Sequence, residues 1–115
     1  MFHRIFPTLP TEREAEAENI YRAIFGALPL SAWTRQGTLI TRFAHGRKLN
    51  FAARRHHCTV GFQGHSAIEF YRFISGDCPV GEVTIKIPYG KSFDARAIED
   101  TIDWYFNNTA TMNMK

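Results

Sequence analysis

The stretch TLITRFAHGRKLNFAARRHHCTVGF, residues 38–62, decides the fold. Apolar and polar residues alternate along it with the period of a β-strand, in three runs at 38–43, 48–53 and 58–62. His45-Gly46 fits the first turn because glycine tolerates positive φ. Connections this short join antiparallel neighbours, so the stretch predicts a three-strand antiparallel meander.

Helical patterns and one more strand flank the meander. Apolar residues recur at helical spacing in residues 11–28 and 94–106, and Ser66 begins a shorter helix that ends before Gly76. Thr11 with Glu14, and Ser66 with Glu69, fit capping boxes. Residues 82–88 alternate again as a strand. The order α-β-β-β-α-β-α predicts an α+β two-layer sandwich, an antiparallel sheet of the meander plus a fourth strand, with helices on one face.

Length and composition fit one globular domain. The 115 residues, 44% of them hydrophobic, predict a single domain 1–115 with its core at about 11–107 and a disordered tail at 108–115. A net charge of +3 is too small to indicate a nucleic-acid binder. Residues 1–10 have no long apolar run, and two cysteines make no disulfide framework, so we expect a cytoplasmic protein without a membrane span.

Carboxylates gather in the first and last predicted helices. They are Glu12, Glu14, Glu16 and Glu18, then Glu99, Asp100 and Asp103. Several are four residues apart and therefore share one side of a helix. Such oxygens suit a hard cation such as iron or calcium. The alternative is a solvated helix face, whose acidic residues favour the helix dipole.

Basic residues gather in the meander instead. They are Arg42, His45, Arg47, Lys48, Arg54, Arg55, His56 and His57. Several of them could share the exposed face of the sheet and bind phosphate or another anion, with Arg47, Arg54, Arg55 and His57 as the candidates. The alternative is an ordinary solvated sheet face.

Signals for catalysis or a closed metal site are weak. The histidines and cysteines match no zinc spacing, and Cys58, on an apolar alternation, is most simply a small buried residue. No G-x-S-x-G, H-E-x-x-H, P-loop or G-x-G-x-x-G motif occurs. The sequence therefore argues against an enzyme, and the remaining alternative is a small enzyme with a pocket between sheet and helices that uses His57 or His65.

Five stretches resemble one known family. They are KLNFAA at 48–53, RHHCTVGF at 55–62, AIEF at 67–70, GEVTIKIP at 81–88 and the segment 94–106. Together they resemble the YdhG-like family, a group of bacterial domains that includes frataxin-like iron chaperones. The chain departs from the family at 33–37, which reads WTRQG where members often have a Met-Pro pair, so the role of that loop does not transfer.

The resemblance implies a fold and a function. The fold is a compact sheet with helices on one face, in agreement with the residue patterns. The function is weak iron binding by acidic helix residues, for delivery to iron–sulfur or haem assembly proteins. By position on the helices, the implied ligands are Glu12, Glu14, Glu16 and Glu18, with Glu99, Asp100 and Asp103 behind them. Three hypotheses therefore stand: an iron-binding protein, an anion- or partner-binding module, and a small enzyme.

Overall fold

A computed structural model describes residues 11–107, apart from the side chains of residues 11, 12 and 30. The predicted disorder of 108–115 lies outside this range. The elements follow the chain as α1 (Thr11–Phe25), a 3-10 helix η1 (Leu30–Ala32), β1 (Thr34–Gln36), β2 (Leu39–Ala44), β3 (Arg47–Ala53), β4 (His57–Gly61), α2 (Ser66–Phe73), β5 (Thr84–Pro88) and α3 (Ala95–Asn107).

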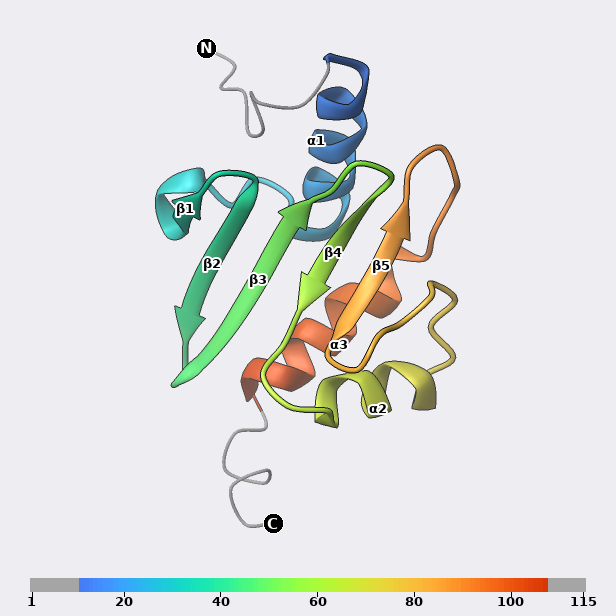
Figure 1. Ribbon diagram of the computed structural model, residues 1–115. Helices are drawn as coiled ribbons and strands as arrows, with labels where there is room; N and C mark the ends of the chain where they lie inside the picture. The colour runs from blue at the N-terminus through green and yellow to red at the C-terminus, as the bar shows by residue number, and fades with distance from the viewer. Residues whose placement is uncertain (1–10, 108–115) are drawn as a thin grey trace.

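The five strands form one antiparallel sheet in the order β1-β2-β3-β4-β5 (Figure 1). The predicted meander is confirmed as β2, β3 and β4. His45 and Gly46 both have positive φ, 53° and 75°, as the turn of a tight hairpin requires. Strand β1 was not predicted, and it extends the sheet beyond the meander.

The helices and the sheet make the expected α+β sandwich. Figure 1 shows α1 and α3 behind the sheet, and α2 beside α3 below the ends of the strands. The core lies between the two layers. Paired residues of four neighbouring strands form one buried row across it: Ile40, Phe51, Val60 and Ile85. Burying such side chains stabilises the fold by about 1.5–3 kcal/mol each.

The helix starts agree with the sequence in part. The side chain of Asp94 caps α3, because its Oδ1 accepts a hydrogen bond of 3.2 Å from the backbone N–H of Ala97. The capping box at Ser66 is wrong. His65 is the N-cap residue of α2 and makes no side-chain cap hydrogen bond, while its backbone carbonyl accepts from the N–H of Glu69. Ser66 is therefore already inside the helix.

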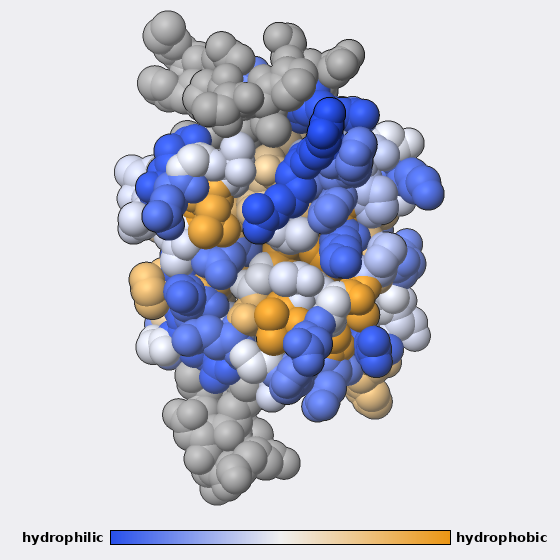
Figure 2. Space-filling model, viewed as in Figure 1, coloured by the Kyte–Doolittle hydropathy of each residue, from blue (hydrophilic) through white to orange (hydrophobic). Residues whose placement is uncertain are grey.

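One face of the sheet has none of the described helices over it, and we call it the uncovered face. Figure 2 views this face and shows hydrophilic and nearly neutral side chains with separate hydrophobic patches. Its ionisable groups within the five strands are Lys48, His57 and Lys86, so none of them is acidic. Phe43 also projects from it and is 71% exposed. Within residues 11–107 no helix has the length and apolar character needed to cross a membrane.

Candidate functional site

The carboxylates of α1 lie in different environments. Glu14 and Glu18 are buried, with 6% and 5% of their surface exposed, and neither is without a partner. Glu16 is partly exposed and forms an ion pair with Arg13, with 3.1 Å between Oε1 and Nη1. The side chain of Glu12 lies outside the described part. The expectation of exposed oxygen ligands is therefore wrong for Glu14 and Glu18, since the buried side of α1 is wider than its apolar stripe.

The carboxylates of α3 are nearer to solvent. Asp100 is paired with Arg96 at 3.3 Å, Asp103 is exposed and Glu99 is partly buried. Helix α1 packs against α3, which would be needed for the two sets of carboxylates to share one surface. However, no three His, Cys, Asp or Glu side chains among the described residues come together to hold a metal ion. The described members of the carboxylate set are therefore not gathered in one site.

Cys58 is fully buried, as predicted for a small apolar residue. Its Sγ lies 3.7 Å from the hydroxyl of Tyr89, which donates a 2.7 Å hydrogen bond to the carbonyl of Arg54. Burial raises the pKa of the Cys58 thiol to about 12, so the thiol stays protonated at neutral pH. A protonated, enclosed thiol is a poor nucleophile and a poor metal ligand.

The basic residues of the meander do not share one face. Arg42 pairs with the core residue Leu49, and this register turns Arg42 to the helix side of the sheet. Arg47 is also on that side, with its guanidinium 4.5 Å from the ring centroid of Tyr105 in α3. Its Nε is buried without a hydrogen-bond partner. Arg47 is therefore separated from the other anion candidates, because the strand period carries it to the opposite face.

A smaller set of basic residues does come together, where β4 and β5 pair beside the β3–β4 turn. His57 pairs with Pro88 and Thr59 pairs with Lys86, so His57 and Lys86 are diagonal neighbours on the uncovered face. Arg54 and His56 lie in the adjoining turn and are exposed. We call these four residues the basic cluster. Arg55 lies in the same turn and is exposed as well.

The pKa of His57 reflects the positive charges of this cluster. Burial lowers the pKa of His57, and the nearby charges of Lys86, Arg54 and His56 lower it further. The ion pairs Arg13–Glu16 and Arg96–Asp100 do not involve the cluster, and no acidic group is among the charges that shift the pKa of His57. Lys86 was missing from the sequence candidates. The alternation of residues 82–88 predicts that Lys86 is on the solvent side of its strand. It does not predict that this strand pairs with the strand of His57.

His65 lines a groove of about 200 Å³ at the start of α2, together with Ile68, Glu69, Arg72, Gly81 and Glu82. Its Nδ1 lies 3.2 Å from the carbonyl oxygen of Glu82. If Nδ1 donates to that carbonyl, Nε2 is left as an acceptor. The groove offers polar side chains but no recognisable nucleophile, and the enzyme hypothesis stays a prediction.

Comparison of this chain with protein-family models, with curated proteins and with solved structures found no match. The resemblance to the YdhG-like family therefore stays a prediction.

Proposed function

We propose that this protein is a small binding module that takes an anionic ligand, or an anionic group of a partner, at the basic cluster. The carrying observation is the convergence of Lys86, Arg54, His56 and His57 at one end of the uncovered face, with no acid paired to them in the described chain. Converging cationic donors without a neutralising acid suit phosphate or sulfate oxygens.

The position of the cluster also favours binding. The backbone that holds it is fixed, since the N–H of Arg54 donates to the carbonyl of His57 at 2.8 Å. The N–H of Tyr89 donates to the carbonyl of His56 at 3.3 Å, which ties the turn to the end of β5. A donor set on a fixed turn loses little conformational entropy when it binds.

The test is a titration with inorganic phosphate, followed by two-dimensional amide NMR. We expect chemical-shift changes at the cluster and weak affinity, since the side chains are exposed. Arg54→Ala and Lys86→Ala should each weaken binding by about threefold to fivefold, the size of an exposed ion pair.

Lys48→Ala is the matched control. Lys48 has the same charge and projects from the same face of the sheet. It lies at the end of β3 that is far from the basic cluster, where it pairs with Phe43 of β2. Its loss should leave phosphate affinity unchanged. Equal loss in all three variants would mean that only net charge matters, and this result would overturn the proposed site.

Iron handling by the helix carboxylates has less support in the geometry. Glu14 and Glu18 are buried, and Glu16 and Asp100 are paired with arginines. The iron-binding role, the iron–sulfur or haem assembly partners and the cytoplasmic location therefore remain predictions from the sequence. Calorimetry with ferrous iron, comparing the protein with a Glu14→Ala/Glu18→Ala variant, tests the first of them.

A further inference from the structure

A groove of about 260 Å³ lies between α1 and the segment that follows β5, on the helix side of the sheet. It is lined by Glu16, Asn19 and Ile20 of α1, by Pro88 at the end of β5, and by Gly90, Lys91 and Phe93 of the segment that follows. The volume is below the range of about 300–1,000 Å³ that holds drug-sized ligands. The groove therefore suits a ligand of metabolite size.

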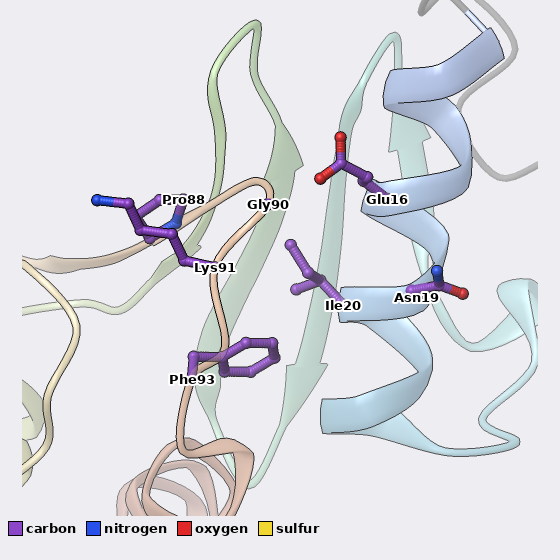
Figure 3. Close-up of a pocket in the computed structure, with 7 residues that line it drawn as sticks. All are labelled: Glu16, Asn19, Ile20, Pro88, Gly90, Lys91 and Phe93. Atoms are coloured by element: carbon purple, nitrogen blue, oxygen red, sulfur yellow. The ribbon is translucent and has the colours of Figure 1, made fainter.

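The floor of the groove is apolar. Figure 3 shows Ile20 from α1 and Phe93 from the loop pointing into the gap between the two elements. Pro88 also lines the groove at the end of β5 and has no N–H to satisfy. An apolar group of a ligand would be removed from water here, which favours binding by a free energy of about 25 cal/mol per Å² of buried apolar surface.

The carboxylate of Glu16 lies at the edge of this floor. Glu16 Oε1 accepts from Arg13 Nη1, and the Arg13 guanidinium lies 5.3 Å from the centroid of the Tyr89 ring. The other oxygen, Oε2, is directed toward Gly90, and a Cβ at Gly90 would lie 3.8 Å from it (Figure 3). A carboxylate accepts several hydrogen bonds, so Oε2 can still receive an ammonium group.

The loop beside the groove also carries a cation. Lys91 is exposed and extends outward from the loop in Figure 3, away from α1. Its four-carbon stem is flexible and can bring the ammonium to a carboxylate at the rim. The groove therefore offers an acid on the helix, an apolar floor and a base on the loop.

From this arrangement we propose that the groove binds a free α-amino acid with an apolar side chain. The ligand's ammonium donates to Glu16 Oε2, its carboxylate lies beside Lys91, and its side chain contacts Ile20 and Phe93. An α-amino acid carries an ammonium, a carboxylate and a side chain on one carbon, and the groove has an acidic, a basic and an apolar partner for them. This site is separate from the basic cluster and does not depend on the function proposed above.

The experiment uses L-leucine as the probe, with amide NMR of the whole chain as the readout. We expect saturable shift changes at Gly90, Lys91 and Phe93. Two analogues test the charges: 4-methylpentanoate lacks the amine, and isoamylamine lacks the carboxylate. Each should bind at least about fivefold more weakly than L-leucine, the loss of one charged hydrogen bond.

Two variants test the walls. Glu16→Gln keeps the shape of the side chain and should weaken L-leucine binding by about fivefold or more. Lys91→Ala alters an exposed residue and should weaken binding by about threefold. Asp103→Asn, an exposed acid on α3, is the matched control and should change nothing.

Three results would overturn the proposal. They are no saturable binding of L-leucine, binding of either analogue as tightly as L-leucine, and unchanged L-leucine binding by a Glu16→Gln variant whose fold is intact by circular dichroism. The Lys91→Ala variant keeps the test decisive if Glu16→Gln fails to fold, because Lys91 is exposed.

Discussion

Gly76 follows α2 and lies directly against the ring of Tyr71. Tyr71 is fully buried, and its hydroxyl accepts a 3.0 Å hydrogen bond from the backbone N–H of Cys78, so the ring cannot move aside. A Cβ built at Gly76 would overlap the ring atoms of Tyr71. The glycine is therefore required by packing at this position.

Gly76→Ala should lower the free energy of unfolding by about 1–3 kcal/mol, the usual cost of overpacking. Urea unfolding followed by circular dichroism measures it. Gly61→Ala is the matched control, because a Cβ there meets its nearest neighbour, Asn50 Cβ, at an ordinary 3.5 Å. A loss at Gly61 as large as that at Gly76 would contradict the packing explanation.

Single residues were predictable where the local pattern decides their environment. Cys58 was predicted to be buried because it sits on an apolar alternation, and it is fully buried. Glu14 and Glu18 were not predicted to be buried, because a charged residue on a helix is usually solvated. Their burial depends on what packs over α1, which the sequence of α1 alone does not specify.

At the scale of elements, β2 shows how a strand divides its side chains between two faces. In the sequence, Leu39, Thr41 and Phe43 alternate with Thr38, Ile40 and Arg42, and the aromatic residue alone would favour the first set as the inward one. The structure places Ile40 in the core instead and leaves Phe43 71% exposed. The face is set by pairing with Phe51 and Leu49 on β3, so it could not be read from β2 alone.

This register predicts opposite outcomes for two phenylalanine substitutions. Phe51→Ala should cost about 3–5 kcal/mol of unfolding free energy, because Phe51 is fully buried in the row that crosses the sheet. Phe43→Ala should change stability by no more than about 0.5 kcal/mol. Thermal unfolding of both variants tests the assignment. A loss at Phe43 comparable to that at Phe51 would mean that the uncovered face is covered in solution.

The long elements were predictable and the shortest strand was not. The meander and the helices have many periodic positions, so their type was readable. Strand β1 has three residues, Thr34, Arg35 and Gln36, all exposed, and shows no apolar alternation. It forms only because β2 offers it a free edge, and this requires tertiary structure.

For the molecule as a whole, the sequence predicted the charge types better than their arrangement. It assigned basic residues to the meander and acids to the helices. It did not separate Arg47, which begins β3 on the helix side, from Arg54, which follows the other end of the strand. The sequence also did not predict that Lys86 lies beside His57 or that Glu16 lies beside Gly90. The first proximity depends on strand pairing and the second on helix packing.

The basic cluster gives the whole protein a pH dependence with a defined sign. The lowered pKa of His57 means that folding favours its neutral form. Without an anion, the stability due to this group is present above the unfolded pKa of about 6.5 and is lost as pH falls through the lower folded value. A bound anion reverses this preference, because its negative charge favours the imidazolium.

Anion affinity should therefore rise as pH falls from about 8 to about 5, the range in which histidine titrates. Sulfate is the suitable probe, since its own charge is constant in this range. We expect a gain of up to about fivefold, the size of an exposed ion pair. His57→Gln should lose most of the gain. His65→Gln, in the separate groove at α2, should keep the full gain. A sulfate affinity that is independent of pH in the unaltered protein would show that His57 does not contact the anion.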